Sequence, residues 1–194
     1  MRALVLASAS PRRKEILTKL GLSFSVAPAD IDEQRLPDER ADAYVARLAL
    51  EKARAVAACQ SGESAVLGAD TTVVIDDDVL EKPRDLADSE RMLRKLSGRE
   101  HQVHTAVALV LCPEQSAHTC VVTTRVRFRA LDEATLKAYV ASGEGLDKAG
   151  SYGIQELGQA LVSEIYGSYS NVVGLPAAET VQLLLASGAL RAWP

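Results

Sequence analysis

The sequence predicts an α/β fold in which helices flank a mixed β-sheet. β-rich apolar runs alternate along the chain with segments whose apolar residues recur every three or four positions, the spacing of amphipathic helices. Two long β-rich runs, at 101–112 and 118–130, are separated by a short turn, which is typical of an antiparallel pair. Alternating strands and helices together with an antiparallel pair favour a sheet that contains both strand directions.

The individual elements follow from periodicity and from turn residues. The expected strands cover 2–7, 23–28, three pieces within 64–83 divided by a break and a turn, 101–112, 118–130 and 160–167. The expected helices cover 11–20, 41–59, 85–96, 132–141 and 175–186. Gly21, Gly98 and Gly143 follow three of them, as expected at helix C-termini. A polar loop at 29–39 and a glycine-rich loop at 143–158 are the long irregular segments.

Composition sets the scale of the protein and excludes some partners. Of 194 residues, 47% are apolar and 4% aromatic, so we expect a single domain over 1–194 with an aliphatic core. The 26 acidic and 22 basic residues leave a net charge of −4, which gives no overall attraction to nucleic acid or to a membrane surface. Any anion-binding site must therefore be local.

The N-terminus and the cysteines lead us to expect a cytoplasmic protein. Residues 1–10 are apolar over too few positions for a signal peptide or a membrane span. Cys59, Cys112 and Cys120 are odd in number and lack Cys-x-x-Cys spacing, so we expect reduced thiols.

The start of the first expected helix carries an unusual concentration of positive charge. Ser10 suits the N-cap and Pro11 the first helical position, but Arg12 and Arg13 follow at once. Cations are unfavourable at this end of the helix dipole unless an anion binds there. One interpretation is therefore a phosphate site, with arginine forks added to backbone N–H groups. The alternative is a pair of exposed arginines screened by salt.

Lys52 lies on the apolar face of the expected helix at 41–59, seven residues after Val45 and four after Leu48. A lysine at such a position can extend its ammonium group outward to water. The other interpretation is that Lys52 supplies positive charge to a pocket. The sequence leaves both open.

Asp70 interrupts an apolar run in LGADTTVV, residues 67–74. A buried carboxylate is unfavourable unless it is paired, binds a metal or changes its pKa. An aspartate in a local turn is the simpler explanation. We favour a functional role, because Gly68 and Thr71 also interrupt the run and the segment contains no hairpin dipeptide.

Further candidates lie in the second half of the chain. Lys82 stands at the end of a short expected strand, although an exposed lysine is the usual case there. Lys148 and Gln155 lie in the glycine-rich loop and could reach a ligand. His101 and His104 are three apart on a strand and face opposite sides, so we expect structural roles for them. Cations and carboxylates from separate segments would suit a polyphosphate with a divalent ion.

Several segments, spread over almost the whole chain in collinear order, together resemble one known family. They are LASASPRRKEIL (6–17), IDE (31–33), ALEKA (49–53), GADTTVV (68–74), EKPRD (81–85), LSGREHQVHTAVAL (96–109), YVASGEGLDKAGSYGIQ (139–155) and GSYSNVVGLP (167–176). This set resembles the Maf family of nucleoside triphosphate pyrophosphatases. The form GADT is similar to the dTTP/UTP branch rather than to the 7-methyl-GTP branch.

The resemblance implies a fold, a reaction and a set of site residues. The implied fold has two lobes around a deep cleft and is related to inosine triphosphatase and Ham1. The implied reaction hydrolyses a nucleoside triphosphate to the monophosphate and diphosphate with a divalent metal, Mg²⁺ or Mn²⁺, in a cytoplasmic homodimer. Asp70 matches the proton acceptor. Base choice is linked to Arg12, Thr71 and Gln155. The phosphate- and metal-handling set matches Ser8, Arg13, Glu33, Lys52 and Lys82, with Glu33 and Asp70 expected to hold the metal.

Two other functions remain open at this point. One is 7-methyl-GTP hydrolysis, since Glu156 stands where the family pattern has a small residue. The other is a nucleotide-binding regulator of septum formation without turnover. Intact Asp70, Glu33, Lys52 and Lys82 favour the enzyme. We expect it to hydrolyse dTTP and UTP, or modified pyrimidine nucleotides, and so to cleanse the nucleotide pool.

Overall fold

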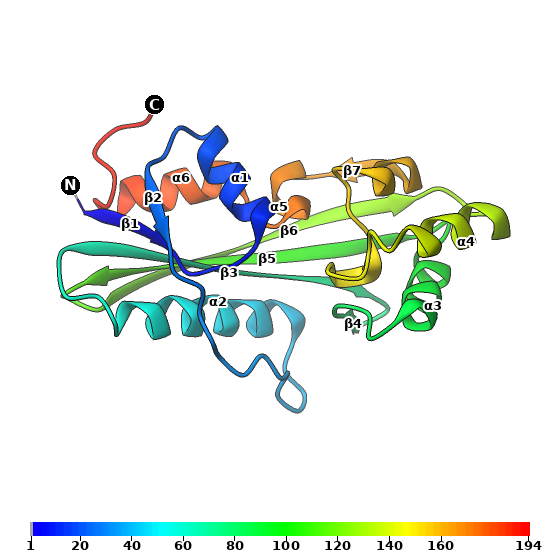
Figure 1. The fold of residues 1–194 in the computed structure, drawn as a ribbon, viewed down its shortest axis with the longest axis horizontal. Helices are drawn as coiled ribbons and strands as arrows, with labels where there is room; N and C mark the ends of the chain where they lie inside the picture. The colour runs from blue at the N-terminus through cyan, green and yellow to red at the C-terminus, as the bar shows by residue number, and fades with distance from the viewer. Residues whose placement is uncertain (1) are drawn as a thin grey trace. The chain divides into compact units, whose positions relative to one another are not determined.

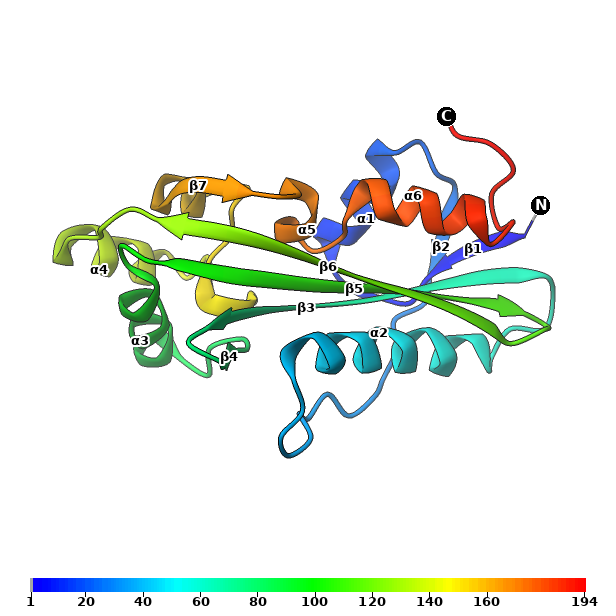
Figure 2. The same ribbon diagram turned by 180° about the vertical axis from the view of Figure 1, so that it is seen from behind.

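A computed structural model describes residues 2–194 (Figures 1 and 2). Its strands are β1 (Ala3–Leu6), β2 (Phe24–Val26), β3 (Ser64–Ile75), β4 (Asp78–Leu80), β5 (Glu100–Cys112), β6 (Ser116–Phe128) and β7 (Val162–Tyr166). Its α-helices are α1 (Pro11–Lys19), α2 (Ala41–Ala57), α3 (Leu86–Leu96), α4 (Glu133–Ser142), α5 (Tyr169–Val173) and α6 (Ala177–Ala186). Two short 3₁₀ helices are η1 (Ala149–Ser151) and η2 (Leu157–Leu161).

Within residues 2–194 seven strands form one mixed sheet, in the order β2-β1-β3-β5-β6-β7 with β4 beside β3. β1 runs parallel to β2 and β3, whereas β4 is antiparallel to β3 and β7 is antiparallel to β6. β5 and β6 are neighbours joined by a turn at 113–115, and Figure 1 shows them running in opposite directions. The predicted mixed sheet with flanking helices is confirmed.

The chain divides into two compact units. The first unit consists of the chain up to Asp70 together with 105–122 and 174–194, and the second of 71–104 and 123–173. Strands β3, β5 and β6 contribute residues to both units.

In the first unit, helices cover both faces of the sheet. Figures 1 and 2 show α2 on one face and α1 with α6 on the other. The side chains of a strand alternate between faces, so every second residue of β3 points to each helix layer. The buried cluster on the α1 and α6 side consists of Leu6, Leu17, Ala65, Leu67, Ala69, Val107, Leu109, Leu111, Leu175, Leu184 and Ala189. The intervening residues of β3, which include Gly68 and Asp70, therefore point toward α2.

Gly68 determines how closely α2 approaches the sheet. A Cβ atom built on it would lie 2.2 Å from the carbonyl oxygen of Ala49 and 2.8 Å from the backbone nitrogen of Ala53. The small residues of α2 thus face a strand position without a side chain, and the two backbones are in contact. This corrects the break expected near Gly68: β3 is continuous from Ser64 to Ile75. Most residues of β3 are buried, which agrees with the largely apolar sequence of a strand that is covered on both faces.

In the second unit, α3 packs against α4 and η1. Asp85 and Asp132 cap α3 and α4, because their carboxylates accept the backbone N–H groups of Asp88 (2.8 Å) and Thr135 (2.7 Å). The ring nitrogen Nε2 of His101 lies 2.8 Å from the hydroxyl of buried Tyr152.

The two histidines have the structural roles expected of them. His101 packs edge to face on Phe128 and Tyr152, and Nδ1 of His104 lies 2.8 Å from the hydroxyl of Thr123. Burial lowers the pKa of His101 to about 4, so its ring is neutral at pH 7.

Three local details differ from the sequence expectations. Ser10 occupies the N-cap position of α1, but its side chain makes no capping hydrogen bond, and its backbone N–H donates to the Ser8 hydroxyl (3.2 Å). The short helix α5 was not expected, and α6 begins at Ala177 rather than at Leu175.

Among the described residues, no helix has both the length and the apolar character needed to cross a membrane.

We expect Gly68→Ala to lower the free energy of unfolding by about 1–3 kcal/mol or more, because the added methyl group forces α2 away from β3. Urea denaturation measures this change. Gly62→Ala is the matched control: no heavy atom of the described chain lies within 4 Å of a Cβ built there, so we expect a change within about 0.5 kcal/mol. Equal effects of the two substitutions would contradict the close approach at Gly68.

Candidate functional site

The candidate site lies where β1 and β2 end beside β3. Leu6 of β1 pairs with Val26 of β2 and with Leu67 of β3, so the carboxyl ends of β1 and β2 meet at one edge of the sheet, whereas β3 continues to Ile75. Ser8 follows β1, the polar loop at 27–40 follows β2, and Asp70 lies three residues beyond Leu67. Ligands of α/β sheets are commonly bound at this edge.

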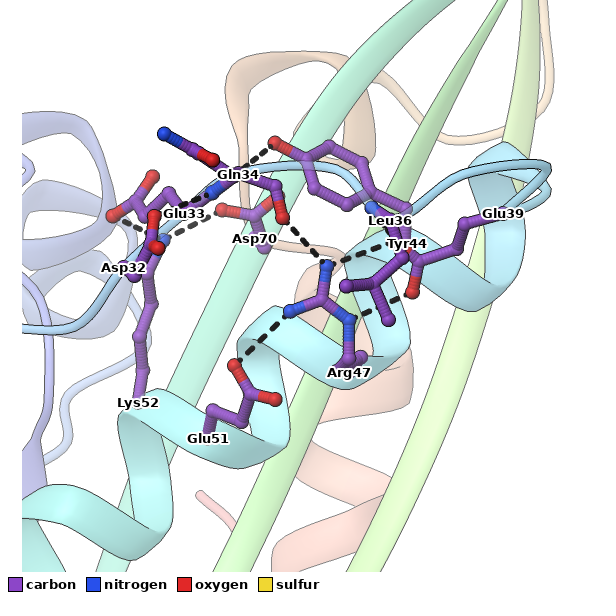
Figure 3. Close-up of polar contacts among 10 residues, drawn as sticks. All are labelled: Asp32, Glu33, Gln34, Leu36, Glu39, Tyr44, Arg47, Glu51, Lys52 and Asp70. Atoms are coloured by element: carbon purple, nitrogen blue, oxygen red, sulfur yellow. Dashed lines mark hydrogen bonds and ion pairs between the residues drawn. The ribbon is translucent and has the colours of Figure 1, made fainter.

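Lys52 connects two carboxylates at this edge (Figure 3). Its Nζ lies 2.7 Å from Oδ1 of Asp70 and 2.9 Å from Oε1 of Glu33. The side chains of Lys52 and Asp70 are only 8% and 11% exposed, whereas that of Glu33 is 51% exposed. The Lys52–Asp70 pair is therefore largely shielded from solvent, whereas the Glu33 side chain is half exposed.

The position of Lys52 follows from the helix and its packing. Lys52 occupies the buried face of α2 together with Val45, Leu48 and Ala49. Because Gly68 lets the helix approach β3, the lysine stem reaches Asp70, two residues further along the same face of the strand. The choice between an outward lysine and one that charges a pocket is thus decided: Lys52 points inward and is paired.

Burial raises the pKa of the Asp70 carboxyl above that of an ordinary aspartate. The positive charges of Lys52 and Arg13 oppose this increase, and the negative charge of Glu33 adds to it. Asp70 therefore takes up a proton more readily than an exposed aspartate, which is a property of a general base.

Arg13 brings the start of α1 into the same cluster. Its Nη1 donates to the hydroxyl of Ser8 (3.1 Å) and its Nε donates to the carbonyl oxygen of Gly174 (2.9 Å). Burial lowers the pKa of its guanidinium; the charge of Arg12 lowers it further, and those of Asp70 and Glu33 raise it. Arg13 is thus held by Ser8 and by the backbone of Gly174, and it lies within electrostatic range of Asp70 and Glu33.

The donor chemistry of this edge suits a divalent cation. Glu33 and Asp70 are hard oxygen ligands that meet at one ammonium group. No group of three or more His, Cys, Asp or Glu side chains among residues 2–194 forms a complete metal cage. Two carboxylates completed by substrate phosphate oxygens are a usual arrangement for Mg²⁺. The residues present therefore fit a metal that binds together with its substrate.

Three expected site residues belong to the second unit. Thr71 follows Asp70 directly along β3 and is half-buried, Lys82 is exposed after β4, and Gln155 is half-buried between η1 and η2. The first unit thus contains Ser8, Arg12, Arg13, Glu33, Lys52 and Asp70.

Sequence patterns did not reveal how the loop around Gln155 is held. The Tyr139 hydroxyl donates to Oε1 of Glu144 (2.8 Å) and accepts the N–H of Gly153 (3.1 Å). The Glu144 carboxylate also accepts the N–H groups of Leu157 (2.8 Å) and Gly158 (3.0 Å). The loop is therefore fixed on both sides of Gln155, through pairings that have no periodic signal.

Lys148 belongs to the same loop, although it was expected to be available to a ligand. Its Nζ donates to the carbonyl oxygen of Glu144 (2.5 Å) and to Oδ1 of Asp147 (2.7 Å). In this structure its ammonium group organises the loop.

Comparison with known proteins gives a consistent picture. Residues 3–187 match the family described as Maf-like protein. A dTTP/UTP pyrophosphatase of Escherichia coli O157:H7 is 54% identical over 193 residues, covering 98% of this chain and 96% of that protein. A dTTP/UTP pyrophosphatase of Vibrio parahaemolyticus serotype O3:K6 is 55% identical over 182 residues, covering 94% and 95%. A solved HAM1 protein from Coxiella burnetii aligns at 19% identity with a TM-score of 0.55 over 96% of this chain and 100% of that chain, which shows a Ham1-like fold.

We expect Lys52→Ala to lower the free energy of unfolding by about 3 kcal/mol, because it leaves Asp70 buried without its nearest cation. Adding Asp70→Asn to this variant removes the uncompensated charge and should restore part of the loss. Urea titrations of the two single variants and the double variant measure the coupling. Strictly additive effects would show that the pair contributes nothing to the fold.

We expect the Asp70 carboxyl of the metal-free protein to titrate above the ordinary aspartate pKa of about 3.9. Lys52→Met should raise this pKa further, since it removes the nearest positive charge. Because the shift favours the protonated form, the stability that Asp70 contributes is complete below its unfolded pKa and is lost as the pH rises through its folded pKa. Carboxyl ¹³C NMR, assigned with Asp70→Asn, measures the midpoint; an equal or lower midpoint in Lys52→Met would contradict this electrostatic account.

Proposed function

The chain belongs to the Maf-like family, and we propose that it is a pyrophosphatase that hydrolyses dTTP and UTP to the monophosphate and diphosphate. The observation that carries the proposal is the buried ammonium group of Lys52 between the carboxylates of Asp70 and Glu33. This cluster lies at the edge of the sheet where α/β proteins bind ligands. The names of the two relatives support the choice of nucleotides.

We assign the basic residues to the triphosphate. Arg12, Arg13 and the Ser8 hydroxyl lie at the start of α1, where backbone N–H groups and the helix dipole also favour a phosphate. Lys52 neutralises charge next to Asp70, and Lys82 is proposed as a second phosphate-binding cation from its motif, EKPRD. Positioning and charge stabilisation supply most of the catalysis in phosphoryl transfer.

Glu33 and Asp70 are the residues that would hold a divalent cation, Mg²⁺ or Mn²⁺. When bound, the cation supplies Lewis-acid stabilisation of charge on the phosphate oxygens. Lys52 contacts Oδ1 of Asp70 and Oε1 of Glu33, so its positive charge lies next to both residues that would hold the cation.

The chemical step assigned to this chain is a general-base hydrolysis. The carboxylate of Asp70 accepts a proton from water, whose oxygen forms a bond to the α-phosphorus. The bond from the α-phosphorus to the bridging oxygen breaks, and diphosphate leaves with the electron pair. A base of this kind contributes about 10²–10⁴-fold to the rate, and the raised pKa of Asp70 suits the role.

The remaining assignments rest on the sequence motifs. Arg12, Thr71 and Gln155 are proposed to select the pyrimidine base, with Glu156 adding negative charge beside Gln155. We further propose that residues 1–194 act as one domain in a cytoplasmic homodimer that cleanses the nucleotide pool. The deep cleft between two lobes stays a prediction.

We expect the purified protein with Mg²⁺ or Mn²⁺ to release diphosphate from dTTP and UTP faster than from CTP, GTP or 7-methyl-GTP. In H₂¹⁸O the label should enter the monophosphate, because water attacks the α-phosphorus. Mass spectrometry of both products measures this. Preferred cleavage of 7-methyl-GTP would assign the other branch of the family, and nucleotide binding without turnover would favour a regulator.

We expect Asp70→Asn to bind dTTP with near-normal affinity and to lose at least about 10²-fold in kcat, because the amide cannot accept the proton. Isothermal titration and diphosphate release measure the two quantities. Unchanged kcat in a folded Asp70→Asn protein would remove Asp70 from the mechanism.

A further inference from the structure

Glu33 lies on a segment that has no regular structure of its own. The loop at 27–40 connects β2 to α2, and the side chain of Glu33 is half exposed. A carboxylate on such a loop reaches a fixed point only if other contacts hold its backbone. The contacts that do so come from α2 (Figure 3).

Two side chains of α2 hold the loop at consecutive backbone carbonyls. The Tyr44 hydroxyl donates to the carbonyl oxygen of Glu33 at 2.8 Å. Nη2 of Arg47 donates to the carbonyl oxygen of Gln34 at 3.0 Å. The guanidinium of Arg47 lies over the Tyr44 ring, 5.7 Å from its centre, so the two side chains form one contact surface for the loop.

Arg47 also holds the far end of the loop through Glu39. Its Nε and Nη2 donate to Oε1 and Oε2 of Glu39 at 2.7 and 2.8 Å, and Oε2 accepts the N–H of Leu36 at 3.1 Å. The fork is partly shielded from water, with side-chain exposures of 22% for Arg47 and 10% for Glu39. A shielded bidentate pair is stronger and more directional than an ordinary surface ion pair.

The same helix, α2, thus positions both the loop at 27–40 and Lys52. Lys52 lies five residues after Arg47 on α2, and the segment that Arg47 and Tyr44 hold ends at Glu33, which contacts Lys52. Nη1 of Arg47 also donates to Glu51 at 3.2 Å, which orients the guanidinium along the helix. A shift of the loop would move the Glu33 carboxylate while leaving Lys52 and Asp70 in contact.

We propose that Tyr44 and Arg47 are positioning residues that fix segment 33–39 to α2 and thereby hold the Glu33 carboxylate at Lys52 and Asp70 before substrate binds. This inference deepens the proposed function and rests on it for the role of Glu33 toward a divalent cation. Neither residue touches the reacting atoms in this assignment. Their effect is on the cation and on kcat, through the position of one carboxylate.

The test compares Arg47→Lys and Tyr44→Phe with Arg54→Lys, which alters an exposed arginine of the same helix. Arg47→Lys keeps the positive charge but removes the guanidinium group that donates two hydrogen bonds to Glu39. Tyr44→Phe removes only the hydroxyl. Each protein is studied by hydrogen exchange over residues 32–40, Mn²⁺ titration without nucleotide, thermal melting, and kcat and KM for dTTP.

We expect faster amide exchange over 32–40 in Arg47→Lys and Tyr44→Phe, and weaker Mn²⁺ binding by about 10- to 100-fold. We expect kcat to fall at subsaturating Mn²⁺ and to recover when Mn²⁺ is raised, with a smaller change in KM. Arg54→Lys should match the wild type in every measurement.

Two results would overturn the inference. One is unchanged exchange over 32–40 in both variants. The other is a lower melting temperature or faster exchange with unchanged Mn²⁺ binding, which would give Tyr44 and Arg47 a purely structural role. If the wild type cleaves neither dTTP nor UTP, the proposed function fails, whereas exchange and Mn²⁺ binding still decide the positioning role.

Discussion

The ammonium group of Lys52, buried against Asp70 and shared with Glu33, is the interaction on which the arrangement of the first unit depends. A charged group removed from water must be paired, and a pair stabilises only when its geometry is fixed. Two features provide that geometry. Gly68 lets the backbone of α2 contact β3, and Arg47 with Tyr44 holds the loop that carries Glu33. Gly68, α2 and the loop therefore all contribute to the positions of the charged groups of Lys52, Asp70 and Glu33.

The two faces of the sheet differ in the residues that they carry: one face contributes to the aliphatic core, and the other carries the polar residues of the candidate site. On the α1 and α6 side, alternate residues of β3 join an aliphatic core. On the α2 side the same strand presents Gly68 and then Asp70, so the carboxylate lies three residues beyond the point where β1 and β2 end. Because the protein has a net charge of −4, the proposed phosphate site depends on the local cations Arg12, Arg13 and Lys52.

Much of the fold was predictable, because most elements carry a local signal. The helices at 11–20, 41–59, 85–96 and 132–141 were expected within one or two residues of their observed bounds. The break near Gly68 was wrong, because a glycine in a strand has the same local pattern whether it ends the strand or admits a neighbouring helix. The place of Lys52 on the apolar face of its helix was predictable from helical spacing, whereas its inward direction and its partners were not.

By itself the sequence determined the order of most strands and helices, the unusual aspartate in an apolar run, the lysine on the apolar face of its helix and the family resemblance. Only the tertiary structure decided that Lys52 pairs with both Asp70 and Glu33, that Arg13 contacts Gly174, 161 residues away, and that Arg47 holds Gln34 and Glu39. The physical reason is that sequence periodicity is local information, which shows only which face of a helix or strand is buried. A hydrogen bond between residues far apart in the sequence depends on where two separate elements place their side chains.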